Sequence, residues 1–238
     1  AKQVHDGYIV RQNVFIAEEN DTLCQVVEDI VDGMRPFPSE HIAQNSLVRN
    51  GEVERSGIYA MHKIHHPSFY CQEFPVRMRD LRLTSSLIDL LGLNILGINN
   101  LFIWKAPEIG LGFPWHQDKY YFRRRFRTET TVGTWTAWTL PIGKRLFYVL
   151  PGSHKSNIFE HDDLEGSQQK EFKLARGVRD EDGVPVEVQP GAVIWFHRHL
   201  IRKSTTITAN ASAVATSPTI LAQRRNGLFP TKLVEISL

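Results

Sequence analysis

The chain is predicted to be a mainly β protein with flanking helices, and three observations support this. Short runs rich in β-branched and aromatic residues recur between Gly and Pro from residue 95 to residue 223. Clear helical spacing of apolar residues is found only ahead of these runs. No internal repeat or linker divides the 238 residues. Short strands separated by Gly and Pro favour an antiparallel sandwich or barrel, and we expect one domain over residues 1–238.

Two amphipathic helices are expected ahead of the strands. In residues 18–34 the apolar side chains recur at helical spacing, and Asp21 is placed to cap the helix. A shorter helix is expected over residues 85–91, where Ser85 or Ser86 can act as the N-cap. Each helix would lay its apolar face on the β core.

The strands are expected where β-branched and aromatic residues are densest. These runs span residues 95–104, 130–140, 146–150, 184–188, 192–197 and 219–223. Residues 160–182 are polar and charged without alternation, so we expect a long surface loop there, with at most one helical turn.

Composition excludes several classes of protein. The 28 basic and 26 acidic residues nearly cancel, which gives no general electrostatic reason to expect nucleic acid as a partner. The two cysteines, Cys24 and Cys71, cannot build a disulfide framework. No apolar run reaches the roughly 20 residues that cross a bilayer, so we expect no membrane span and a soluble, cytoplasmic protein.

A His-x-Asp motif is the first candidate for chemistry. His116 and Asp118 are two residues apart, and on a strand this spacing turns both side chains to one face. Two imidazoles and a carboxylate on one face of Fe(II) form the metal site of many non-haem oxygenases. The motif alone is weak because it arises often by chance, and a second histidine is needed.

Four segments together give the motif its context. They are FPWHQDKYYF at residues 113–122, WTA at 135–137, LFYVLPGSHK at 146–155 and PGAVIWFH at 190–197. In this order they resemble the phytanoyl-CoA dioxygenase family, over residues 6–223. The resemblance implies a double-stranded β-helix (jelly roll, cupin-like) that binds Fe(II) and 2-oxoglutarate and oxidises an apolar substrate.

The resemblance also suggests roles for individual residues. It places the family's first two metal ligands at His116 and Asp118. Trp135 and Ser204 stand where the family has residues that touch 2-oxoglutarate, and Tyr120 or Tyr121 could line the same pocket.

Two positions depart from the family pattern. The family's distal histidine falls on Arg202, whose guanidinium stays protonated and has no lone pair for a metal. The arginine that clamps the far carboxylate of 2-oxoglutarate falls on Ala213, and Arg224 and Arg225 lie too far along the chain to replace it. The sequence therefore indicates an oxygenase scaffold with an altered site.

Two local features leave alternatives open. His197 and His199 could supply a third metal ligand, but their odd numbers place them on the opposite face from position 202 unless a bulge intervenes. The basic run at residues 123–127 is interleaved with aromatics and could bind phosphate, CoA or an acidic partner, although a solvated loop is the commoner explanation.

Three functions are consistent with these residues. We favour a non-catalytic subunit, in secondary metabolism, that supports an active homologous oxygenase in a heterodimer; this chain would then bind no cofactor, and the partner would hold Fe(II), 2-oxoglutarate and an apolar substrate. The alternative is an active Fe(II)/2-oxoglutarate-dependent hydroxylase with His197 or His199 as third ligand. The third is a metal-free protein that uses the old cavity for an apolar ligand.

Overall fold

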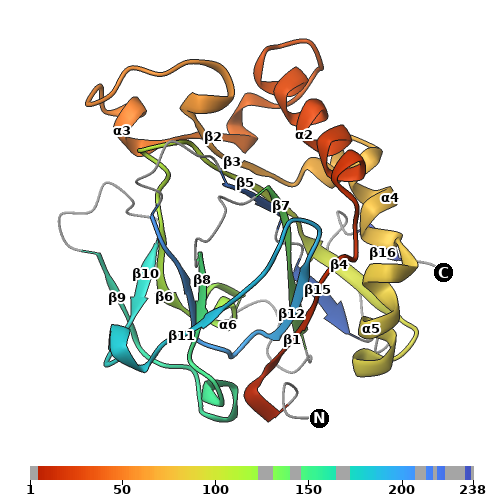
Figure 1. The fold of residues 1–238 in the computed structure, drawn as a ribbon, viewed down its shortest axis with the longest axis vertical. Helices are drawn as coiled ribbons and strands as arrows, with labels where there is room; N and C mark the ends of the chain where they lie inside the picture. Colours follow the sequence, from red (N-terminus) through yellow and green to blue (C-terminus); the bar gives the residue numbers. More distant parts are fainter. Residues whose placement is uncertain are drawn as a thin grey trace.

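The computed structural model shows two antiparallel sheets that face each other, with helices on the outside (Figure 1). It describes residues 5–122, 131–139, 146–164, 172–206, 213–216, 219–222 and 234–236. Two facing antiparallel sheets confirm the sandwich class that the short runs of β-branched residues predict.

The larger sheet contains ten strands of the described chain. Its main path runs β16 (Val234–Ile236), β4 (Ile95–Asn99), β15 (Thr219–Ala222), β7 (Thr131–Thr139), β14 (Ala213–Thr216), β5 (Leu101–Lys105), β3 (Met61–His65) and β2 (Ile42–Gln44). Strand β12 (Val193–His197) also pairs with β7, and β1 (Tyr8–Arg11) pairs with β12.

The smaller sheet contains four strands and carries the most informative motifs. Its order is β11 (Val184–Val186), β8 (Phe147–Val149), β13 (Arg202–Ser204) and β6 (Phe113–His116). Between the two sheets lies an apolar core of Trp135, Ala137, Phe147, Val149, Val186, Ile194, Phe196 and Leu200. A close-packed core of aromatic and aliphatic side chains therefore joins the two sheets next to the strands that carry the motifs.

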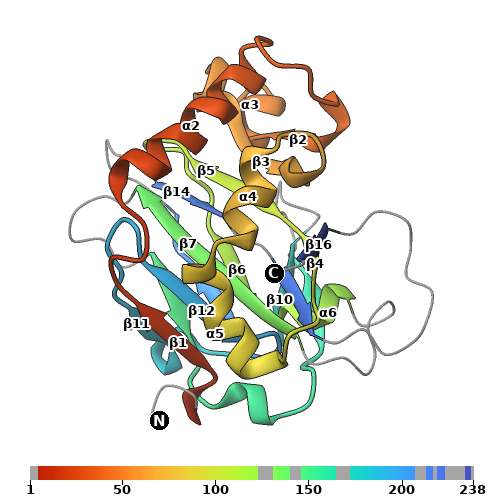
Figure 2. The ribbon, with the colours of Figure 1, turned by 90° about the vertical axis from the view of Figure 1, so that its right-hand side faces the viewer.

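Helices α2 (Ala17–Val31), α4 (Glu73–Arg79) and α5 (Leu81–Leu91) cover the outer face of the larger sheet (Figure 2). Leu23, Val27 and Ile30 of α2 are buried against this sheet, as the helical spacing of apolar residues predicts. Shorter helices are α3 (Ser46–Arg49), α6 (Asp118–Phe122) and the 3-10 turns η1 (Ser39–His41), η2 (Gly57–Ala60), η3 (Pro67–Phe69), η4 (Ser153–Lys155) and η5 (Asp180–Asp182). No helix in the described part of the chain is long and apolar enough to span a membrane.

The expected helix caps are wrong at both helices. Helix α2 begins after Ile16, whose backbone N–H donates a hydrogen bond to the Glu19 carboxylate at 3.0 Å. Asp21 therefore lies inside the helix. Helix α5 begins one turn earlier than expected because the Asp80 side chain accepts a hydrogen bond from the Arg82 backbone N–H at 2.8 Å. The Asp80 carboxylate satisfies a free N–H of the first turn, and Ser85 and Ser86 lie inside the helix.

Two other expectations need correction. The run at residues 95–104 is two strands, β4 and β5, separated at Asn100. The segment 160–182 is not a loop throughout, because β9 (His161–Asp163) pairs with β10 (Lys173–Ala175) as an antiparallel hairpin, followed by the helical turn η5. The hairpin shows no alternating pattern because its charged residues pair with one another, as Lys173 of β10 does with Asp163 of β9.

Gly133 on β7 is required by the packing of the two sheets. It lies opposite Phe196 of β12 in the strand register, and a Cβ at Gly133 would overlap the Phe196 ring. We expect Gly133→Ala to lower the free energy of unfolding by about 1–3 kcal/mol, because the ring is only 1% exposed and has no room to move. Urea unfolding checks this by a double-mutant cycle with Phe196→Leu, which removes the ring that the new Cβ would meet. An equal loss from Gly133→Ala with and without the Phe196 ring would contradict the steric explanation.

Candidate functional site

The His-x-Asp motif lies where β6 passes into α6, and not along a single strand as expected. His116 is the last residue of β6, and Asp118 is the first residue of α6. The two side chains nevertheless converge, with His116 Nε2 3.5 Å from Asp118 Oδ1. The other ring nitrogen, Nδ1, lies 2.7 Å from the carbonyl oxygen of Pro114, which holds the ring with Nε2 toward the site.

Gln117, between them, holds this turn in place. Its side-chain amide donates to the His199 carbonyl at 2.6 Å and accepts from the Phe159 backbone N–H at 2.7 Å. Its own backbone N–H donates to His161 Nε2 at 3.1 Å. Gln117 is fully buried, so these bonds lie in a low dielectric and fix the backbone of the motif without help from a ligand.

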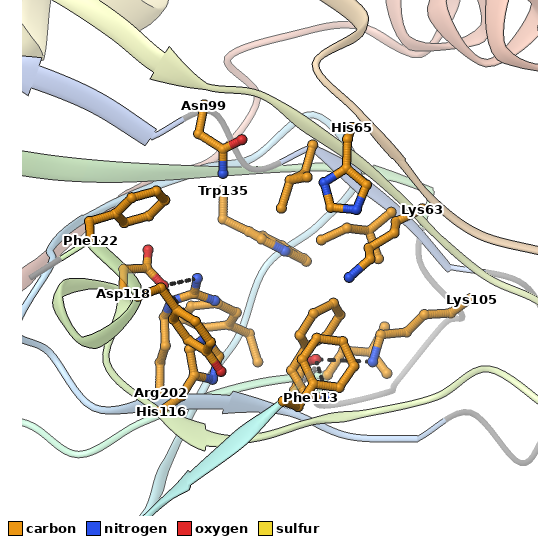
Figure 3. A pocket seen from close by; sticks show the side chains of 17 residues that line it. Lys63, His65, Asn99, Lys105, Phe113, His116, Asp118, Phe122, Trp135 and Arg202 are labelled. Carbon is orange, nitrogen blue, oxygen red and sulfur yellow. Dashed lines mark hydrogen bonds and ion pairs between the residues drawn. The ribbon is translucent and has the colours of Figure 1, made fainter. Parts of the chain in front are cut away.

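Arg202 forms an ion pair with the carboxylate of the motif (Figure 3). Strand β13 pairs with β6 so that Arg202 lies opposite His116. The guanidinium Nη2 is 2.6 Å from Asp118 Oδ1, the same oxygen that faces His116. The side chains of Arg202 and Asp118 are only 12% and 8% exposed. The side chain at position 202, where the resemblance predicts a histidine, thus directs a cation at the carboxylate of Asp118.

Aromatic rings surround the charged end of Arg202. Its guanidinium carbon lies 4.6 Å from the centre of the Phe196 ring and 5.7 Å from that of Phe147. Guanidinium groups stack well on ring faces, which offsets part of the loss of hydration on burial. Arg202 is therefore held on two sides, by an ion pair and by the aromatic core.

The charge of Asp118 depends on these neighbours. Burial raises the pKa of Asp118, but the Arg202 guanidinium and His116 outweigh it and lower that pKa to about 2. Asp118 therefore stays ionised at neutral pH. Its second oxygen, Oδ2, is buried and has no hydrogen-bond partner in the described chain.

These donors do not fit Fe(II). A facial site needs a third neutral or anionic ligand, whereas Arg202 carries a positive charge and no lone pair. A unit positive charge about 4 Å from Fe(II) costs on the order of 8 kcal/mol at an effective dielectric near ~20. No group of three or more His, Cys, Asp or Glu side chains arranged to hold a metal occurs among the described residues.

A cavity of about 310 Å³ lies beside the ion pair. Figure 3 shows that side chains from both sheets point into it. Its lining is mostly aromatic and aliphatic: Leu101, Ile103, Phe113, Tyr121, Phe122, Trp135, Leu146, Phe147 and Phe172, with Lys63, His65, Asn99, Lys105, His116, Asp118, Arg202 and Ser204 as polar members. A cavity of this size and polarity can hold a small organic molecule.

The residues expected to touch 2-oxoglutarate divide into two groups. Trp135 and Ser204 both line the cavity. Tyr120 does not; its ring stacks on His161 with 4.1 Å between ring centres, and Tyr121 lines the cavity instead. Tyr120 turns away because consecutive residues of helix α6 point in different directions.

His197 and His199 lie away from the cavity. His197 lines a separate pocket with Gly7 and His154. Its Nδ1 accepts a hydrogen bond from the His199 backbone N–H at 3.1 Å, and the two imidazole rings are 5.0 Å apart. Burial lowers the pKa of His197 to about 4, so this imidazole is neutral at pH 7 but is not directed at Asp118.

The remaining candidates lie partly beyond what the structure describes. Ala213 on β14 is the register partner of Lys105 on β5. Arg224, Arg225 and the basic run 123–127 lie outside the described residues. The sequence reasoning missed Lys63 and Lys105, which line the cavity from β3 and β5. For Lys105 the signal was a lysine at the end of the apolar run 101–104, where an interior side chain would be expected to be apolar. Lys63 lies between two histidine-containing pairs in Met61–His65 and carries no such signal.

The fold is that of solved proteins whose crystal structures contain iron or 2-oxoglutarate. EctD from S. alaskensis in its apo form superposes with a TM-score of 0.67 at 19% identity, over 92% of this chain and 74% of EctD. EvdO2 from Micromonospora carbonacea var. aurantiaca gives a TM-score of 0.70 at 15% identity, over 97% of this chain and 92% of EvdO2. These similarities confirm the predicted jelly-roll fold.

The chain belongs to the phytanoyl-CoA dioxygenase (PhyH) family, whose profile matches residues 4–215. Human peroxisomal phytanoyl-CoA dioxygenase is 32% identical over 123 residues, which are 48% of this chain and 35% of that protein. A probable phytanoyl-CoA dioxygenase of Caenorhabditis elegans is 30% identical over 129 residues, which are 49% of this chain and 40% of that protein. The matched segments thus span less than half of either relative.

The ion pair makes a testable contribution to stability. Arg202→Met leaves the buried Asp118 carboxylate without its ion-pair partner, and we expect it to lower the free energy of unfolding by about 3–5 kcal/mol. The double variant Arg202→Met/Asp118→Asn removes both charges and should recover most of this loss. Urea unfolding at pH 7 checks both variants. If the loss of unfolding free energy in the double variant equals the sum of the losses in Arg202→Met and in Asp118→Asn alone, the two side chains do not interact.

The pKa of Asp118 also predicts a pH dependence. The folded-state pKa of about 2 lies below the ordinary value of 3.8, so the folded protein binds this proton less readily than the unfolded chain. The stability from Asp118 is therefore fully present above about pH 4 and is lost as the pH falls toward about 2. Unfolding curves measured across this range should show a steeper loss for the wild type than for Arg202→Met/Asp118→Asn. Parallel curves would contradict the assignment.

Proposed function

We propose that this chain is a non-catalytic member of the phytanoyl-CoA dioxygenase family that supports an active homologous oxygenase. One observation carries the proposal: the Arg202 guanidinium lies 2.6 Å from the carboxylate that would bind iron. The scaffold around this pair is intact, with both sheets, the cavity and the buried Gln117 in place. An intact fold whose metal position holds a cation suits a supporting role better than oxidation.

A partner surface is the second element of the proposal. Large apolar side chains are exposed on the outer helices or next to them, with Val76 at 67%, Leu81 at 65% and Leu93 at 71%. Apolar side chains on an outer face are favourable contacts for another protein. A heterodimer with an active homologue, in secondary metabolism, would use such a face while the partner holds Fe(II), 2-oxoglutarate and the apolar substrate.

The active hydroxylase is the weaker candidate on this geometry. It needs His197 or His199 beside Asp118, and both line or adjoin another pocket. A movement of β12 large enough to bring either histidine into the cavity would disrupt its pairing with β7 and β1. We therefore propose that this chain does not oxidise a substrate by itself.

Metal binding tests the proposal directly. Anaerobic calorimetry at pH 7 should detect no Fe(II) binding by the wild type, with or without 2-oxoglutarate. Arg202→His removes the cation and adds an imidazole opposite His116, so Fe(II) should bind at least about tenfold more tightly, or ~1.4 kcal/mol. Lys203→His is the matched control because Lys203 points to the other side of β13, where it contacts Asp180 and Trp115.

Two outcomes would overturn this function. Fe(II) binding by the wild type that 2-oxoglutarate strengthens would mean that a complete metal site exists. The partner role has its own test, in which the chain is co-expressed with active homologues from the same source and the products are sized by chromatography. If no homologue co-elutes, and none gains activity or stability, the subunit role is wrong.

A further inference from the structure

A second cavity lies on the outer face of the larger sheet, beneath the last turn of α5. Its volume is about 210 Å³, and residues of β1, β7, β12, η4 and α5 line it. Figure 2 shows α5 beside β12, and the Trp195 indole N–H donates to the Leu83 carbonyl of that helix at 3.1 Å. The helix is therefore fixed over the strand, and the space beneath its end is part of the fold.

Strand β12 separates the second cavity from the first. Side chains alternate along a strand, so Trp195 and His197 point to the face opposite that of Phe196. Phe196 packs against the Arg202 guanidinium, whereas Trp195 packs with Leu91 of α5. The described residues that line the two cavities do not overlap. A ligand of the second cavity would thus bind apart from His116 and Asp118.

The second cavity is apolar except for two imidazoles. Its aliphatic and indole walls are formed by Ile9, Leu90, Leu91, Val132 and Trp195, and its imidazoles belong to His154 and His197. Burial lowers the pKa of His197 to about 4 and also lowers that of His154, so both rings are neutral at pH 7. The described lining contains no lysine, arginine or carboxylate. A charged ligand would lose hydration there without gaining a counter-charge, which favours an uncharged one.

His197 offers this cavity a hydrogen-bond donor. Its Nδ1 accepts from the His199 backbone N–H at 3.1 Å, so the proton of the neutral ring is on Nε2. The backbone N–H of His197 donates to the Gly7 carbonyl at 2.9 Å, which fixes the residue between β1 and β12. None of the hydrogen bonds within the described chain uses the Nε2 proton. The imidazole is therefore oriented in advance, with one donor available to a ligand.

His154 and Gly7 shape the same end of the cavity. The rings of His154 and His197 are 5.6 Å apart between centres. Gly7 has a φ of +92°, and a Cβ there would overlap the His154 ring. Only glycine thus lets β1 pass this close to the imidazole. The polar groups lie together at this end, whereas the residues contributed by α5 are apolar.

We propose that the second cavity binds a small uncharged ring compound that carries one carbonyl oxygen. The oxygen accepts from His197 Nε2, and the ring packs against Trp195 and Leu91. Size supports a single ring, because an apolar cavity of ~150 Å³ already takes up benzene. A carbonyl suits the site because it accepts a hydrogen bond and brings no donor that would need a partner of its own. The site goes beyond the proposed function and does not depend on it.

Calorimetry of the full chain with acetophenone and ethylbenzene tests the proposal. The two probes share a ring and differ in the carbonyl oxygen. His197→Phe keeps a ring at the position without the donor, so it should weaken acetophenone binding by about 3- to 10-fold and leave ethylbenzene binding no weaker. Leu90→Trp adds bulk at the half-exposed rim of the cavity and should weaken both probes. Leu101→Phe, which narrows the first cavity instead, is the matched control and should change neither probe.

Three results would overturn the site. Equal loss of both probes in His197→Phe, or no loss of either, would show that Nε2 does not bind the carbonyl. Binding that Leu101→Phe removes and Leu90→Trp leaves intact would place the ligand in the first cavity. Absence of acetophenone binding by the wild type would also refute the proposal. If His197→Phe does not fold, the comparison of Leu90→Trp with Leu101→Phe still decides the location. The supporting role proposed above is tested by Fe(II) and by partner binding, so it stands or fails separately.

Discussion

The ion pair between Arg202 and Asp118 is the interaction that determines the charge and the hydrogen bonding of the site. It joins β13 to the start of α6, and the rings of Phe196 and Phe147 enclose its cationic side. A buried pair is weak support for stability in general, because loss of hydration offsets attraction. Its consequence here concerns metal binding. Asp118 Oδ1 is paired with the Arg202 cation, so the neighbouring His116 lacks the free carboxylate that a metal site would need.

The architecture separates the side chains that line the cavity from much of the packing that holds the two sheets together. The inter-sheet core includes Val149, Val186 and Ile194, which do not line the cavity. The cavity keeps its shape because its walls belong to strands of both sheets. The chemistry of the cavity can therefore change through single side chains, while packing elsewhere preserves the fold.

Local sequence patterns predicted the regular elements better than their ends or the position of the site. The apolar spacing of α2 and the aromatic runs of β7 and β12 predicted those elements, since burial on one or both faces leaves a readable pattern. The cap at Asp80, the β9–β10 hairpin and the short strand β6 depend on tertiary contacts that leave little trace in sequence. His116, Asp118 and Arg202 were identified through a family resemblance, whereas Lys105 became visible only when β5 was placed beside the cavity.

Gln117 has a wider consequence for how this protein matures. Its buried amide connects the motif to two distant segments through the His199 carbonyl and the Phe159 backbone N–H. A metalloprotein whose ligand turn is ordered by its ion reaches its final form only when that ion is supplied in the right oxidation state. Here the polypeptide provides the cross-links itself. The turn that carries His116 and Asp118 can therefore reach its final form through hydrogen bonds of the polypeptide itself, before any ligand enters the cavity.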